Sequence, residues 1–179
     1  MSESEERSEE GAEVALDPAQ QLYLMQSLQS EQNLVLAVLA GLLSALLGAG
    51  IWAGVTLATG YQIGFMAVGV GFLVGYAVRV AGKGVSAPFG FVGAGFALLG
   101  CALGNLLAVT AMVAEREGLP FLSALGQLNP EVIAELMVVT FSPMDLLFYG
   151  IAIYEGYRLS FRQLSEEELQ RKLSGSPTA

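Results

Sequence analysis

A stretch of 47 residues without a charged side chain, between Glu31 and Arg79, restricts the fold of this chain more than any other feature. About 20 residues of helix cross the hydrocarbon core of a bilayer, at about 1.5 Å of rise per residue. The stretch is therefore long enough for two crossings. Hydrophobic residues make up 54% of the 179 residues and charged residues 14%, which is more apolar than an ordinary soluble domain. The sequence thus predicts an all-α, polytopic membrane protein.

Four membrane-spanning helices account for the apolar segments. We place them at about 34–58, 61–80, 89–114 and 143–161. Thr59 and Gly60 provide a tight external turn between the first two, and the segment 82–88, with its glycines and its proline, provides a short loop before the third. The expected fold is a four-transmembrane-helix bundle with interfacial and short cytoplasmic helices, in one membrane domain that covers 17–161.

The last crossing has a clear local start signal. Ser142 can cap a helix, Pro143 takes its first position, and Asp145 lies in its first turn, next to the positive end of the helix dipole. These three positions predict that the crossing begins at Ser142 and continues to about residue 161.

The preceding segment, 115–142, leaves two arrangements open. Only nine residues separate Glu135 from Asp145, which is too few to cross the membrane core. We therefore expect an external interfacial segment of one or two helices. The alternative is one long helix from Pro130, kinked at Pro143, which would place Asp145 inside the membrane.

The N-terminal region combines a polar tail with a helix. Residues 1–16 are rich in Ser and Glu and predict a disordered acidic tail. From Asp17, which can cap a helix, the pattern changes to apolar residues spaced three apart, and 17–31 is expected to form an amphipathic helix on the membrane surface. The acidic start, where a secretory signal has a basic one, argues against a cleavable signal peptide.

The C-terminal tail, 162–179, carries a capping box that begins at Ser165 and has Glu168 at its third helical position. It predicts a short cytoplasmic helix.

The distribution of Lys and Arg predicts the orientation. With the N-terminus in the cytoplasm, the outer side holds only Arg116 and the inner side collects the other seven basic residues. Those seven are Arg7, Arg79, Lys83, Arg158, Arg162, Arg171 and Lys172. We therefore expect both termini to be cytoplasmic. Arg79 and Lys83 are then candidates for contact with anionic lipid headgroups.

Small residues recur every four positions in three of the predicted crossings. Because small side chains let helix backbones approach closely in lipid, these residues are candidates for helix packing. The set is Gly41, Ala45, Ala49, Ala53, Ala67, Gly71, Gly75, Gly100 and Gly104, to which Ala37 adds one further position of the first face. Packing within the bundle, self-association and docking on a partner all remain open.

Polar groups at membrane depth are the other candidates, since burying them is costly unless they are paired. Asn105 lies well inside the third crossing, where interhelical hydrogen bonding or contact with a substrate would explain it. Glu155 is expected to form an ion pair with Arg158 or with Arg79. Asp145 is either a first-turn residue of its helix or a proton or cation site.

Several function classes are disfavoured by composition. A net charge of −9 argues against a nucleic-acid partner. Histidine is absent and Cys101 is the single cysteine, so no histidine-based metal site, no Cys-based zinc site, no disulfide framework and no Ser-His-Asp triad is possible. We expect no catalytic residues, no cofactor and no bound metal.

Some segments resemble uncharacterised bacterial multi-pass membrane proteins. The similar runs are 75–84 (GYAVRVAGKG), 89–94 (FGFVGA), 99–105 (LGCALGN) and 142–149 (SPMDLLFY). That family has no known activity, so the resemblance implies a location in the bacterial inner (plasma) membrane and transfers no site.

The leading hypothesis for function is a non-enzymatic membrane component that packs against itself or against another membrane protein. The alternative is an oligomeric transporter or channel for a small solute or an ion, with Asn105 and Asp145 near its path. A membrane-embedded enzyme ranks third, because the sequence shows no convergent set of ionisable groups.

Overall fold

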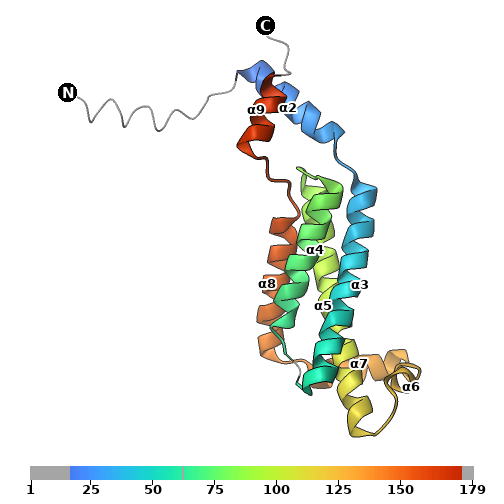
Figure 1. Cartoon of the computed structure of the whole chain (residues 1–179). Helices are drawn as coiled ribbons and strands as arrows, with labels where there is room; N and C mark the ends of the chain where they lie inside the picture. Colours follow the sequence, from blue (N-terminus) through green and yellow to red (C-terminus); the bar gives the residue numbers. More distant parts are fainter. Residues whose placement is uncertain (1–16, 62, 175–179) are drawn as a thin grey trace, which may run out of the picture. The chain divides into compact units, whose positions relative to one another are not determined.

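The computed structural model describes residues 17–61 and 63–174. Over these residues the chain is helical, with turns between the helices and no strand (Figure 1). The all-α prediction is therefore confirmed for the described part of the chain. The predicted acidic tail, 1–16, lies outside the described residues. The chain divides into two units, Met1–Glu31 with Gln163–Ala179, and Gln32–Arg162.

The second unit is built around four long helices that lie side by side (Figure 1). They are α3 (Leu34–Thr59), α4 (Met66–Gly82), α5 (Ala87–Arg116) and α8 (Pro143–Leu159). Helices α4 and α5 contact each other and also contact both α3 and α8. Helices α3 and α8 thus lie on opposite sides of the α4/α5 pair.

Close contacts between small residues fix the helix directions. Gly100 and Gly104 of α5 lie against Ala45 and Ala49 of α3, so α3 and α5 run in the same direction. Helix α4 runs in the opposite direction, since Gly41 and Gly48 of α3 lie against Val78 and Val70 of α4, in reversed order. Helix α8 runs parallel to α4 and antiparallel to α5.

Local signals end and start these helices at one end of the bundle, which we call the loop end. Lys83 ends α4 in the left-handed conformation, with φ 49°. The Asn33 side chain caps α3 by accepting a hydrogen bond from Leu36 N at 3.0 Å, and Asn33 N donates to Gly82 O at 2.9 Å. Arg162 N donates to Gly84 O at 2.8 Å, so the segment after α8 returns to the same loop.

The second helix starts later than the sequence predicts. The expected crossing began at 61, whereas α4 begins at Met66, because Gly60 ends α3 with φ 70° and Gly64–Phe65 form a turn. Met66 N then donates to Ile63 O at 3.1 Å. Residues 63–66 have no polar side chain, in the turn or in the helix, so hydropathy alone does not locate the start.

The segment between α5 and α8 contains two further helices, α6 (Phe121–Leu125) and α7 (Pro130–Thr140). The Asn129 side chain caps α7 by accepting from Val132 N at 2.9 Å. Phe141 is extended, and the axes of α7 and α8 differ by 102°. The described residues therefore contain two separate helices here rather than one moderately kinked helix.

Length and composition identify the helices that could cross a membrane. Helices α3 and α5, of 26 and 30 residues, are long and apolar enough, and a third span results if the bent pair α7 and α8 counts as one. Helix α4 is apolar but has 17 residues. Two or three helices of the described chain could therefore span a membrane.

The bundle carries most of its large apolar side chains on the outside. Val35, Leu43, Phe91 and Leu146 are all more than 60% exposed, whereas the interior is lined mainly by Ala, Gly and Val. A soluble protein would bury side chains of this size, but in lipid they face an apolar solvent and small residues bring the helices together.

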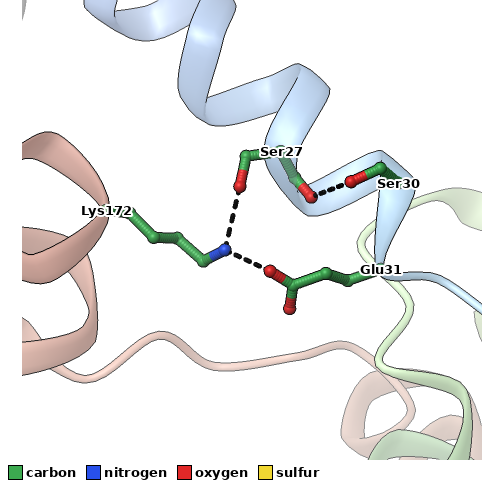
Figure 2. A network of polar contacts seen from close by, with 4 residues as sticks. All are labelled: Ser27, Ser30, Glu31 and Lys172. Atoms are coloured by element: carbon green, nitrogen blue, oxygen red, sulfur yellow. Dashed lines mark hydrogen bonds and ion pairs between the residues drawn. The ribbon is translucent and has the colours of Figure 1, made fainter. Parts of the chain in front are cut away.

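The first unit contains α2 (Pro18–Ser30) and α9 (Glu166–Ser174), which contact each other. Asp17 and Gln20 form a capping box at the start of α2. Figure 2 shows Lys172 of α9 reaching two side chains of the other segment: its Nζ donates to Ser27 Oγ at 2.9 Å and forms an ion pair with Glu31.

Candidate functional site

The most unusual side chains of the bundle are Trp52 and Thr56, which lie one turn apart on α3 and are each 1% exposed. Trp52 is the only tryptophan of the sequence. Its ring packs on Gly104 of α5, where the Cβ of an alanine would lie 2.6 Å from Trp52 Cε3. Glycine at this position therefore makes room for the indole between the two helices.

Asn105 follows Gly104 on α5 and is also 1% exposed. Its Nδ2 lies 3.9 Å from the sulfur of Met137 on α7, a contact with a weak acceptor. The structure thus places Asn105 in the interior, with its amide directed towards α7. Trp52, Thr56 and Asn105 share this burial, and we call these three residues the interior polar cluster.

Two atoms of this cluster lack a hydrogen-bond partner among the residues that the structure describes: Trp52 Nε1 and Thr56 Oγ1. Leaving a buried donor unsatisfied costs about 1–3 kcal/mol. Other buried hydroxyls of the bundle avoid this cost within their own helix, since Thr110 Oγ1 donates to Leu106 O at 2.8 Å and Ser160 Oγ donates to Gly156 O at 2.6 Å.

A second set of polar contacts joins α4, α5 and α8 one turn away from Asn105. Cys101 is fully buried, and its thiol donates to Ala67 O at 3.6 Å. The hydroxyl of Tyr149 donates to Cys101 O at 3.2 Å. These contacts tie the three helices together and leave Cys101 without access to reactants.

Asp145 belongs to the capping box at the start of α8. Its Oδ2 accepts a hydrogen bond from Ser142 N at 2.8 Å, and Ser142 Oγ accepts from Met144 N at 3.3 Å. The side chain is half-buried and also lies near Gly64, whose hypothetical Cβ would be 3.6 Å from Asp145 Oδ1. The local start signal that the sequence contains is thus formed.

The expected ion pair of Glu155 with Arg158 or with Arg79 stays a prediction. Arg158 lies on the exposed side of α8, whereas Glu155 is partly covered by α4, where a Cβ at Gly75 would lie 3.0 Å from the Glu155 carbonyl oxygen. Lys83 is exposed at the loop end and Arg79 is half-buried in the last turn of α4.

The structure places all nine predicted small residues inside the bundle, as buried positions of α3, α4 and α5. Their partners on α8 were missed by the sequence reasoning. Gly71 lies against Ala152, and Gly93 of α5 lies against Gly156, whose own hypothetical Cβ would be 2.8 Å from Gly93 O. The spacing Ala152, Gly156, Ser160 every four residues is the signal that could have identified this face.

One pair of glycines faces outward instead. Gly50 and Gly54 lie four residues apart on α3, both are exposed, and a Cβ added at either would have no heavy atom within 4 Å. They form a G-x-x-x-G pattern that the packing of the chain leaves uncovered, and sequence reasoning missed it beside the more regular alanine face of the same helix.

A cavity of about 340 Å³ lies between the end of α5 and helices α6 and α7. Its lining is mostly apolar, with Glu117 and Gln127 as its charged and amide side chains. The full lining is Thr110, Val113, Glu117, Leu119, Ala124, Gln127, Leu128, Val132 and Leu136.

Neither metal-ligand geometry nor similarity to known proteins assigns a function to this chain. Among the described residues, no group of three or more His, Cys, Asp or Glu side chains could hold a metal ion. Comparison of the chain with protein-family models, with curated proteins and with solved structures finds no match. The geometry of the bundle is therefore the basis for a proposal of function.

Proposed function

We propose that this protein is a four-crossing membrane component whose role is assembly rather than catalysis, and that its α3 helix contacts a second copy of the chain through Gly50 and Gly54. The observation that carries the proposal is the uncovered G-x-x-x-G pair on a long, apolar, exposed helix. Small residues at this spacing let a second helix approach closely in lipid.

Helix direction supports four crossings. If α3 and α5 span the membrane, they do so in the same direction, and the chain between them must cross back. Helix α4 is the connecting helix, and its 17 residues extend about 26 Å, close to the hydrocarbon thickness of about 30 Å. Helix α8 has the same length and returns to the loop end, where Arg162 N bonds Gly84 O.

Charge asymmetry supports the orientation. The loop end carries four basic residues, Arg79, Lys83, Arg158 and Arg162. The opposite end of the bundle carries Arg116 as its basic residue, together with acidic ones from α5, α7 and α8. Because Lys and Arg are enriched on the cytoplasmic side, the loop end would face the cytoplasm of a bacterial cell, with Arg79 and Lys83 at headgroup level.

The cost of glycine in a helix supports the contact. A glycine within a helix is less favourable than alanine by about 0.8–1.0 kcal/mol. At Gly41 or Gly104 the fold requires it, because a Cβ would lie 2.6 Å from a neighbouring ring. At Gly50 and Gly54 no neighbour within the chain requires it, and a second helix packed on this face would explain two glycines at this spacing.

The test is co-isolation of two differently tagged copies from their native membrane in mild detergent. The double variant Gly50→Leu/Gly54→Leu should reduce co-isolation at least about tenfold, which corresponds to about 1.4 kcal/mol of association free energy. Gly95→Leu on α5 is the matched control, since a Cβ there also meets nothing within 4 Å. Equal co-isolation of the wild type and the double variant would overturn the proposed contact.

An oligomeric transporter or channel for a small solute or an ion is the second candidate, and the interior polar cluster favours it. Polar side chains inside a membrane bundle are costly and often mark a path for a polar solute. Liposomes containing the purified protein should then show flux that falls in Asn105→Leu and in Asp145→Asn. Flux equal to that of protein-free liposomes would leave the assembly role as the better account.

A further inference from the structure

The cavity of about 340 Å³ at the end of α5 is large enough for a small organic molecule. An engineered apolar cavity of about 150 Å³ binds benzene, and ligand pockets of proteins measure about 300–1,000 Å³. The chain forms this cavity by turning at Gly118, whose φ is 65°, after which both α6 and α7 contact α5 (Figure 1). All of its lining belongs to one unit of the chain, Gln32–Arg162.

Most of the cavity wall is apolar. Six of the nine lining residues are Val, Leu or Ala. The hydroxyl of Thr110 is directed to its own helix, where Oγ1 donates to Leu106 O at 2.8 Å. A molecule that fills this cavity therefore gains contacts mainly through a hydrocarbon part.

The backbone donors of the wall are already used. Three lining residues, Thr110, Val113 and Leu136, lie within α5 and α7, where each N–H bonds the carbonyl four residues earlier. The other six donate their N–H to oxygen atoms of the chain at 2.8–3.2 Å, and they are Glu117, Leu119, Ala124, Gln127, Leu128 and Val132. In the described part of the chain, the lining also includes no Lys or Arg. An anionic group in this cavity would lose its hydration without gaining donors, which is costly.

The polar side chains of the lining offer acceptors instead. Glu117 is the C-cap of α5, at the negative end of the helix dipole, and brings a carboxylate to the cavity. The Gln127 amide donates through Nε2 to Ser123 O at 3.4 Å, which leaves its Oε1 as an acceptor. The cavity therefore combines an apolar wall with a negative charge and an amide oxygen.

We infer that this cavity binds a small apolar molecule that carries an amine. The hydrocarbon part would fill the apolar wall, and the ammonium group would donate charge-assisted hydrogen bonds to Glu117 and a hydrogen bond to Gln127 Oε1. A lipid chain would make the apolar contacts and leave Glu117 unused, and a carboxylate would be repelled by it. The inference involves none of the residues of the proposed contact at Gly50 and Gly54, so either can fail without the other.

Three probes of one shape test the charge preference. They are 1-naphthylmethylamine, 1-naphthalenemethanol and 1-naphthoate, titrated calorimetrically into the full chain in nanodiscs of zwitterionic lipid, with the heat of empty nanodiscs subtracted. The amine should bind about three- to fivefold more tightly than the alcohol, as expected for a partly exposed ion pair. The carboxylate should bind most weakly. No amine binding above that of empty nanodiscs, or equal affinity for amine and carboxylate, would overturn the inference.

Matched variants test which side chains form the site. Glu117→Gln should abolish the preference for the amine over the alcohol, whereas Glu115→Gln should keep it, because Glu115 carries the same charge on the same helix end and does not line the cavity. Ala124→Leu, which fills the cavity, should weaken both the amine and the alcohol. Ser123→Leu, one residue away and outside the lining, should weaken neither. A preference for the amine that survives Glu117→Gln would refute the site, and so would unchanged affinity in Ala124→Leu.

Discussion

Gly71→Ala should destabilise the bundle, whereas Gly69→Ala, two residues earlier on α4, should not. At Gly71 the added Cβ would lie 2.5 Å from the carbonyl oxygen of Ala152 and 2.7 Å from its Cα. Both are backbone atoms of α8, so no side-chain rotation can remove the clash. At Gly69 the Cβ would have no heavy atom within 4 Å.

Two opposing contributions set the change in the free energy of unfolding. Ordinary contacts between heavy atoms lie near 3.5 Å, so α4 and α8 must separate locally by about 1 Å to admit the methyl group. Overpacking of this kind costs about 1–3 kcal/mol. Replacing a helical glycine by alanine returns about 0.8–1.0 kcal/mol, and Gly69→Ala measures that return by itself. The free energies of unfolding of the two variants should therefore differ by about 1–3 kcal/mol.

Unfolding by sodium dodecyl sulfate in mixed micelles, followed by helical circular dichroism, measures this difference. Gly71→Ala should shift the midpoint to lower detergent fraction than Gly69→Ala, with the wild type between the two variants. The same midpoint for both variants would refute the reasoning, because it would mean that α4 and α8 do not approach as closely as Gly71 and Ala152 indicate.

Three further perturbations have expected outcomes. Ser142→Ala should cost about 1 kcal/mol of unfolding free energy through loss of the α8 cap, and Ser123→Ala, whose hydroxyl caps no helix, is its control in the same micelle assay. Lys172→Gln should speed amide hydrogen exchange in α9, because it removes an ion pair with Glu31 worth about 0.2–1 kcal/mol. The effect should be smaller at high salt, which screens exposed charges. An equal effect from Arg171→Gln would argue against the specific pair with Glu31. Cys101 should not react with a membrane-permeant maleimide until the protein is unfolded, since it is 0% exposed. The new thiol of the control variant Arg116→Cys should react at once, because this position is exposed. Rapid labelling of Cys101 in the folded protein would contradict its burial.

Local signals explain why several helix ends could be predicted. The start of α8 depends on Ser142, Pro143 and Asp145, which are adjacent in the sequence and form the cap by themselves. The charge-free stretch predicts apolar helices long enough for two crossings, and Asn33 and Gly60 end the first of them, α3, by local capping. The start of α4 could not be located in this way, since residues 63–65 are equally apolar in a turn and in a helix.

The candidate site was predictable only in part. Asn105 is conspicuous as a polar residue within an apolar segment, and its burial agrees with the cost of placing an amide in lipid. Thr56 gave no such signal, because a threonine in a helix usually bonds its own backbone. Whether a hydroxyl does so depends on its rotamer, which is set by the neighbouring helix.

The sequence by itself determined that this protein is helical and apolar enough to enter a membrane, because charge, hydropathy and capping act over a few neighbouring residues. Only the tertiary structure decided how the small residues are used. Gly71 and Gly104 are covered by other helices, and Gly50 and Gly54 on α3 are not, although all four occur at similar spacing in similar surroundings. The physical reason is that close packing depends on which helix faces which, and this follows from the direction and pairing of segments far apart in the chain.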